Sequence, residues 1–166
     1  MDIIELFLDE ENEHAGIEAI SVVESPAIES DFILQRILMG AALIPNKPIY
    51  RKNENSDGYY VFFSKATVKK ASEMFFIKGN QSKATVEHQM SVENLTVVES
   101  WLVDDPKMDK SVKYGLDVPE GTWMISMKVN NDEVWKEVKD GTYKGFSIEG
   151  FFSDQANRPK EQIEEE

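Results

Sequence analysis

The fold is decided by one stretch, Trp123-Met124-Ile125-Ser126-Met127-Lys128-Val129. Its odd-numbered positions are all large and apolar, whereas Ser126 and Lys128 stand at even-numbered positions. Side chains of a β-strand point alternately to its two faces, so a period of two predicts a strand with one face in a hydrophobic core. We therefore expect a β-sheet at the centre of the molecule.

Further strands are predicted on both sides of this stretch. Short runs of branched and aromatic residues between turn signals place them at about 3–8, 17–23, 49–51, 59–63, 83–90, 95–103 and 143–152. Most of the chain is thus expected to be extended.

Helices are predicted at three places. Ser64 is a plausible N-cap for a helix over 65–78, in which Val68, Ala71 and Phe75 share one face. Asn131 caps a shorter helix that ends before a glycine, and a third short helix is expected within 27–39. The fold class is therefore α+β and mostly β, a closed or strongly bent antiparallel sheet with two to three flanking helices.

The composition fits one globular domain. The chain has 166 residues, of which 41% are hydrophobic, and it contains no cysteine. Disulfides, thiolate catalysis and cysteine-based zinc sites are therefore excluded. Thirty-one acidic residues against 18 basic ones give a net charge of −13, which repels phosphate backbones, so no nucleic-acid partner is expected.

No apolar run approaches the roughly 18 residues of a membrane helix, so no membrane partner is expected. The first residues lack the basic region of a signal peptide, which favours a cytoplasmic protein. We expect one domain over 1–153 and an acidic, mobile tail over 154–166.

Histidine is scarce, which narrows the search for chemistry. His14 stands in an acidic turn and is expected at the surface. His88 falls on the predicted strand 83–90, where it is either a core residue bonded to backbone or a general base, a role for which imidazole is well suited. Two histidines in such different contexts make a poor ligand set, so no metal or other cofactor is expected.

A serine stands between two glycines in Lys144-Gly145-Phe146-Ser147-Ile148-Glu149-Gly150. Alternation places Ser147 and Glu149 on one face of a strand and the intervening hydrophobes on the other. Glycine weakens a strand unless a bulge or a close backbone approach needs it, and a bound substrate strand is one such approach. Ser147 is accordingly either a polar strand position or a nucleophile, although the spacing is not that of a nucleophile elbow.

Glu99 shares its strand face with Val97, Trp101 and Val103. A carboxylate among apolar neighbours is costly unless it is paired. A histidine is an economical partner, because a carboxylate orients and stabilises the imidazolium. The alternatives are an exposed sheet or a pair with a lysine.

Five segments in this order resemble the phage prohead proteases, and most closely the XkdF-like phage serine proteases: Gly40–Asn46, Glu87–Met90, Val97–Trp101, Gly121–Met124 and Lys144–Phe152. The resemblance implies a fold similar to herpesvirus assemblin, a bent β-barrel with flanking helices. It implies an endopeptidase that cuts scaffold and major capsid protein, and itself, inside the assembling procapsid in the host cytoplasm. It also implies a homodimer or higher assembly, because assemblin-like enzymes are activated by dimerisation.

The resemblance implies catalytic roles for Ser147 as nucleophile and His88 as base. Assemblin-type enzymes use a second histidine after the serine, and here none follows Ser147. Glu99 is the preferred third member, Glu149 the alternative and Asp104 a weaker choice.

Related phage enzymes imply cleavage after glutamate with a hydrophobe two residues earlier, as in Ile163-Glu164-Glu165 and Val22-Val23-Glu24. The competing interpretation is a catalytically inactive phage structural or scaffold-associated domain with the same fold, since acidic charge suits scaffolding.

Overall fold

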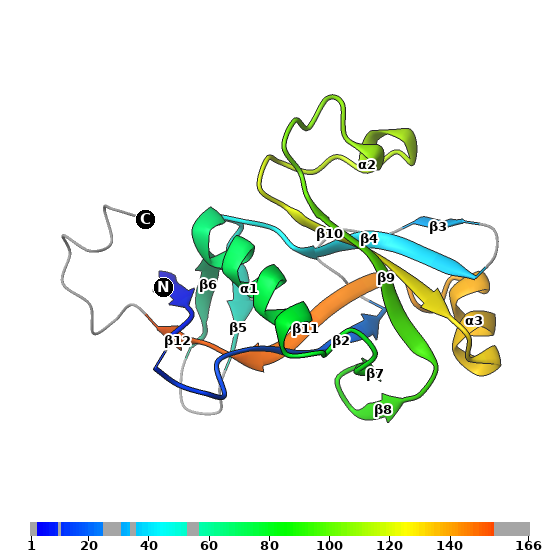
Figure 1. Cartoon of the computed structure of the whole chain (residues 1–166), viewed down its shortest axis with the longest axis horizontal. Helices are drawn as coiled ribbons and strands as arrows, with labels where there is room; N and C mark the ends of the chain where they lie inside the picture. The colour runs from blue at the N-terminus through cyan, green and yellow to red at the C-terminus, as the bar shows by residue number, and fades with distance from the viewer. Residues whose placement is uncertain (1–2, 10, 25–30, 34–35, 53–56, 155–166) are drawn as a thin grey trace.

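The computed structural model describes residues 3–9, 11–24, 31–33, 36–52 and 57–154 (Figure 1). Within these residues the chain forms three four-stranded sheets and three helices. The α+β class with a majority of strands is therefore confirmed. The described strands do not close into the single barrel that was expected, and two neighbouring strand pairs, β1·β6 and β2·β7, are parallel rather than antiparallel.

The β1 sheet and the β2 sheet are joined through the last long strand. The β1 sheet has the order β12 (Ser153–Asp154), β1 (Ile3–Phe7), β6 (Tyr59–Phe63) and β5 (Ile49–Arg51). The β2 sheet has the order β11 (Gly145–Phe151), β2 (Gly16–Val23), β7 (Ala84–Val86) and β8 (Met90–Val92). Because β12 follows β11 after one residue, the chain passes directly from one sheet to the other.

The third sheet is built around the stretch that dominates the sequence, and we call it the β10 sheet. Its order is β3 (Asp31–Ile33), β4 (Ile37–Leu43), β10 (Trp123–Val129) and β9 (Leu95–Leu102). The odd-numbered residues of β10 lie in the main hydrophobic core, as predicted. Met124 lies in a second, smaller core with Ala41 and Val103, so β10 is buried on both faces.

The helices follow the predicted caps. Helix α1 (Lys65–Ile77) begins at Ser64, whose side chain accepts a hydrogen bond from Thr67 N, and Val68, Ala71 and Phe75 are fully buried. Helix α3 (Asp132–Lys139) is capped by the side chain of Asn131. The short helix α2 (Lys110–Lys113) was not predicted. It lies in the segment 103–122 between β9 and β10, which projects from the sheets (Figure 1).

The helix expected within 27–39 is wrong for the residues that the structure describes there. Strand β3 pairs antiparallel with β4 from Asp31↔Met39 to Ile33↔Ile37. Strand β4 in turn pairs with β10, so the sheet ladder satisfies the backbone that a helix would have satisfied internally. Residues 27–30 and 34–35 lie outside the described residues.

A bulge at Glu18 of β2 accompanies a close approach of β2 to β11. The register shifts between Glu149 and Gly150, opposite Ala19 and Ile17 of β2. A Cβ on Gly150 would stand 2.2 Å from the carbonyl oxygen of Gly16. Gly150 is therefore required because β2 of the same chain approaches it closely. A bound substrate strand was another close approach that could have explained a glycine here.

The expected tail over 154–166 lies outside the described residues except for Asp154, which pairs through its backbone with Leu6 of β1. The described part of the chain contains no helix long and apolar enough to cross a membrane.

Candidate active site

His88 lies in the turn between β7 and β8, and the prediction that it stands on a strand is wrong. Gln89 N donates to Val86 O at 3.0 Å, and the two residues between them, Glu87 and His88, have φ values of 53° and 56°. Positive φ at both central positions is the pattern of a type I′ turn, where Asn-Gly is the favoured pair. A glutamate and a histidine are strained there, and strain of this kind clusters at functional sites.

Three hydrogen bonds attach this turn to the neighbouring strand β2 and its end. Glu87 N donates to Val22 O at 3.0 Å, and His88 N donates to Ser21 Oγ at 2.9 Å. The carboxylate of Glu87 accepts from Glu24 N. The positive φ values are thus maintained by contacts with β2, and they direct the His88 imidazole toward β11.

The imidazole of His88 contacts Glu149 of strand β11. Its Nδ1 lies 3.1 Å from Glu149 Oε2, and the side chains are 41% and 31% exposed. The hydroxyl of Thr85 donates to the same carboxylate oxygen. A carboxylate beside Nδ1 favours the tautomer with the proton on that nitrogen, which leaves Nε2 as the acceptor.

Ser147 lies on the face of the β2 sheet that carries this pair. It stands opposite Ser21 of β2, which in turn stands opposite Thr85 of β7, so the three residues form one row across neighbouring strands. Glu149 is two residues further along β11 on the same face, about 6.6 Å away at the usual rise of a strand. Phe146 is buried in the core on the opposite face, as the alternation predicted.

No hydrogen bond joins Ser147 and His88 within the described residues. Catalytic hydrogen bonds are often long in the absence of substrate and shorten in the complex, so the assignment of a nucleophile and its base does not require this bond in the free protein. The structure therefore brings Ser147, His88 and Glu149 to one face.

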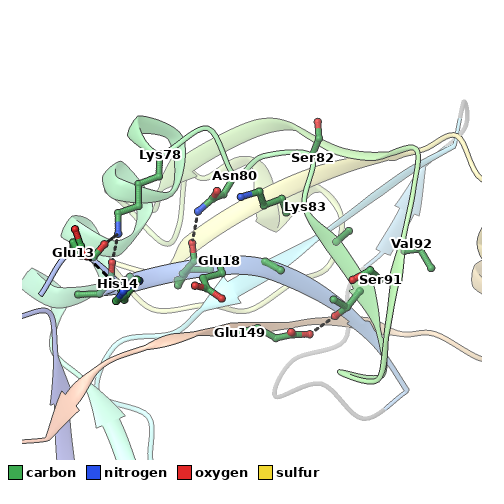
Figure 2. A pocket seen from close by; sticks show the side chains of 16 residues that line it. Glu13, His14, Glu18, Lys78, Asn80, Ser82, Lys83, Ser91, Val92 and Glu149 are labelled. Carbon is green, nitrogen blue, oxygen red and sulfur yellow. Dashed lines mark hydrogen bonds and ion pairs between the residues drawn. The ribbon is translucent and has the colours of Figure 1, made fainter.

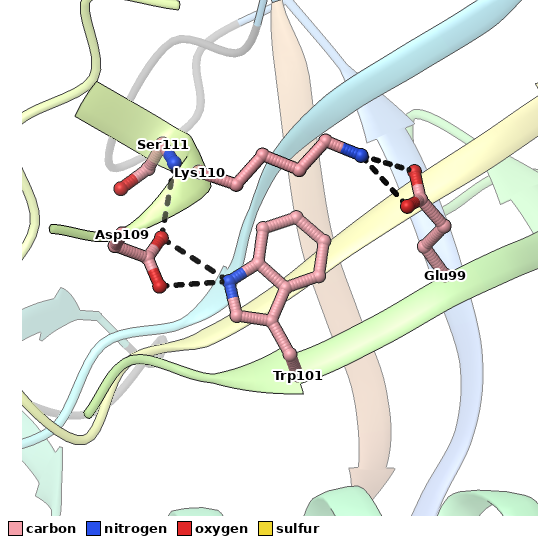
Figure 3. Close-up of polar contacts among 5 residues, drawn as sticks. All are labelled: Glu99, Trp101, Asp109, Lys110 and Ser111. Carbon is pink, nitrogen blue, oxygen red and sulfur yellow. Dashed lines mark hydrogen bonds and ion pairs between the residues drawn. The ribbon is translucent and has the colours of Figure 1, made fainter. Parts of the chain in front are cut away.

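Glu99, the preferred partner of His88 in the sequence, does not contact it. It lies on β9 in the β10 sheet, where both carboxylate oxygens accept from Lys110 Nζ at 2.7 and 2.9 Å (Figure 3). This is the lysine pair that the sequence left as an alternative. The hydrogen bond from Lys110 holds the pKa of Glu99 below its usual range.

The reason for this separation is a change of sheet between β8 and β9. Strand β8 pairs with β7, whereas β9 pairs with β10, so the short sequence distance from His88 to Glu99 does not place them on neighbouring strands. Asp104, the weaker choice, is exposed beyond the end of β9. The contact with His88 is made by the alternative acid, Glu149.

Trp101 and Asp109 extend the polar cluster around Glu99. The indole Nε1 of Trp101 donates to the carboxylate of Asp109 at 3.1 Å, and Lys110 Nζ lies 5.6 Å from the centre of the indole ring (Figure 3). These contacts fix the start of helix α2 on strand β9. The cluster thus anchors the projecting segment 103–122 to strand β9.

A groove of about 680 Å³ includes Glu149 in its lining, whereas neither His88 nor Ser147 lines it (Figure 2). Thr85, Lys83, Lys78 and His14 also line it. Lys78 Nζ donates to the carbonyl oxygens of Glu13 and Ala15. His14 is exposed, as expected, with a side chain 73% accessible.

Two residues of the site were not singled out in the sequence, Ser21 and Thr85. Their hydroxyls contact the backbone of His88 and the carboxylate of Glu149 respectively. No local signal marks them, because their role depends on the pairing of β2 with β7 and β11. The described residues contain no group of three side chains suited to hold a metal ion.

Comparison with known proteins gives one family. Residues 35–155, about three quarters of the chain, match the family described as "Putative phage serine protease XkdF". No match was found among curated proteins or among solved structures, and the expected relation to assemblin stays a prediction. The matched residues include Ser147, His88 and Glu149, and the chain belongs to the XkdF family of phage serine proteases.

Proposed function

We propose that the protein is a serine endopeptidase in which Ser147 is the nucleophile, His88 the general base and Glu149 the acid that orients it. The observation that carries the proposal is the contact between His88 Nδ1 and Glu149 Oε2 on the strand face that also carries Ser147. Membership of a phage serine protease family supports the reaction type.

The geometry supports a conventional division of roles. With Nδ1 bonded to Glu149, His88 Nε2 accepts the proton of Ser147 Oγ as that oxygen attacks the scissile carbonyl. The carboxylate of Glu149 stabilises the imidazolium that forms. Backbone N–H groups stabilise the oxyanion, the imidazolium then protonates the leaving amine, and water releases the acyl group by the same route.

We propose phage scaffold and major capsid protein as substrates, cut inside the assembling procapsid in the host cytoplasm. Membership of a phage serine protease family supports this choice of substrates. Of the two candidate self-cleavage sites, Val22-Val23-Glu24 has two buried residues within strand β2, so the folded chain withholds it. Ile163-Glu164-Glu165 lies outside the described residues.

The test is cleavage of purified scaffold and capsid protein by the wild type and by Ser147→Ala and His88→Ala. Loss of one member of such a triad lowers the rate by about 10⁴-fold or more, and we expect each variant to lose cleavage to that extent. Ser91→Ala and His14→Ala are the matched controls, since Ser91 stands in the same row of the sheet and His14 is the other histidine.

Identical fragments from the wild type and Ser147→Ala would refute the proposal. So would failure of a reactive-serine probe to label Ser147 in assembled particles. That second result would favour the catalytically inactive structural or scaffold-associated domain instead.

A further inference from the structure

A row of hydroxyl side chains crosses the whole β2 sheet at the level of Ser147. In register, Ser147 of β11 stands opposite Ser21 of β2, Ser21 opposite Thr85 of β7, and Thr85 opposite Ser91 of β8. Paired residues on neighbouring strands are about 5 Å apart and point to the same face. The nucleophile proposed above is thus the first member of a continuous polar row.

The two central members of the row bond to the two partners of the acid–base pair. Thr85 Oγ1 donates to Glu149 Oε2, the oxygen that also contacts His88 Nδ1. Ser21 Oγ accepts from His88 N at 2.9 Å. One hydroxyl therefore fixes the carboxylate, and the other fixes the backbone that carries the imidazole.

Both hydroxyls are buried, whereas the groups that they hold are not. Ser21 is fully buried and Thr85 is 8% exposed, but the side chains of His88 and Glu149 are 41% and 31% exposed. An exposed histidine in a strained turn and a half-buried carboxylate each have alternative rotamers open to them. Buried hydrogen bonds from rigid strands remove that freedom, and a proton-transfer pair needs its geometry held to a fraction of an ångström.

We propose that Thr85 and Ser21 are positioning residues that hold Glu149 and His88 in the geometry for proton transfer with Ser147. The proposal rests on the proposed function. Neither hydroxyl exchanges a proton with substrate, and each acts through its partner.

Steady-state cleavage by matched variants tests the catalytic part. Thr85→Val keeps the shape of the side chain but removes the donor, and Thr85→Ser restores it. We expect Thr85→Val to lower kcat about tenfold or more with KM unchanged, and Thr85→Ser to recover most of that loss. Ser21→Ala is expected to lower kcat similarly, because His88 N loses its acceptor.

Thr96→Val is the control for loss of a hydroxyl, because Thr96 lies on β9 in the β10 sheet and its hydroxyl is hydrogen-bonded to Ser82 at 3.0 Å. Wild-type kcat in both Thr85→Val and Ser21→Ala would overturn the proposal. An equal loss in Thr85→Val and Thr85→Ser would also overturn it, since it would show that packing rather than the donor matters.

Imidazole ¹⁵N spectra test the positioning directly and need no proteolysis. The chain has only two histidines, so His14 serves as the internal reference. In the neutral wild type we expect His88 to carry its proton on Nδ1, and in Thr85→Val to shift toward the Nε2–H form while His14 stays unchanged. An unchanged His88 tautomer would refute the positioning role even if Ser147 proves catalytic, and wild-type protein that cuts nothing would refute the proposed function instead.

Discussion

At the scale of single residues, Glu99 and Glu149 were both candidates for the acid beside His88, and the structure gives them different surroundings. Glu99 is bound by Lys110 in the β10 sheet, and Glu149 is bound by His88 and Thr85 in the β2 sheet. Both stand on strands, so the residue that contacts the carboxylate is what distinguishes them. The histidine partner marks Glu149 as the third member of the proposed triad.

Exchange of each carboxylate for an amide separates these roles. Glu149→Gln is expected to lower kcat by about 10³- to 10⁴-fold, because an amide does not stabilise the imidazolium and permits the wrong tautomer. Glu99→Gln is expected to leave kcat within twofold of wild type and to cost at most about 1 kcal/mol of stability, as a partly exposed ion pair does. Initial rates of scaffold cleavage and urea unfolding measure the two effects, and the reverse ranking of the rates would contradict the assignment.

Tyr143 predicts a pH dependence of folding that is independent of the site. Burial, together with the nearby carboxylate of Glu137, raises the pKa of Tyr143 to about 12. The folded state favours the neutral phenol, so this stabilisation is complete below the unfolded pKa of about 10 and is lost as the pH rises toward about 12. Stability of the wild type should therefore fall more steeply over that window than stability of Tyr143→Phe.

Ultraviolet titration of tyrosinate gives the measurement for Tyr143. One of the five tyrosines should ionise well above the usual range in the wild type, and that step should be missing from Tyr143→Phe. Parallel titrations of the two proteins would contradict the prediction.

At the scale of elements, the bulge at Glu18 of β2 sets the register of Glu149 and of the end of β11, from which the chain passes into the β1 sheet. Gly150 is needed there because a Cβ would overlap the carbonyl oxygen of Gly16. Gly150→Ala is expected to cost about 1–3 kcal/mol of stability and to lower kcat through displacement of Glu149. Chemical unfolding and cleavage rates measure both losses, and a variant as stable and active as wild type would show that β2 and β11 separate without cost.

Elements with a regular period could be predicted from the sequence, and those that depend on pairing could not. Helix α1 was predicted from the Ser64 cap and the spacing of Val68, Ala71 and Phe75, because these signals lie within the helix itself. The turn at Glu87-His88 was missed because neither residue is a usual type I′ turn residue, and its hydrogen bonds come from β2, more than sixty residues earlier in the chain. Strand β3 was missed although its partner β4 follows it closely, because three residues are too few to show a strand period of their own.

At the scale of the whole molecule, strand β10 contributes residues to both hydrophobic cores. Trp123 is fully buried, packs edge-on against Phe75 of α1 and donates through Nε1 to Ser100 Oγ at 2.8 Å. Trp123→Ala is expected to cost about 3–5 kcal/mol, since it removes a large core side chain and a partly buried hydrogen bond. Trp101→Ala, which removes a half-buried indole, is the control and should cost less in denaturant unfolding, and a larger cost at Trp101 would contradict this account.

The sequence by itself determined the α+β class, the buried face of β10, the caps of α1 and α3, and Ser147 and His88 as candidates in a family motif set. These features follow from local periodicity, local capping and the order of motifs, all of which can be recognised from the order of residues alone. Only the tertiary structure decided which carboxylate contacts His88, and that Ser21 and Thr85 hold the pair. The physical reason is that side chains on different strands meet through sheet register, and register depends on pairings between segments far apart in the chain.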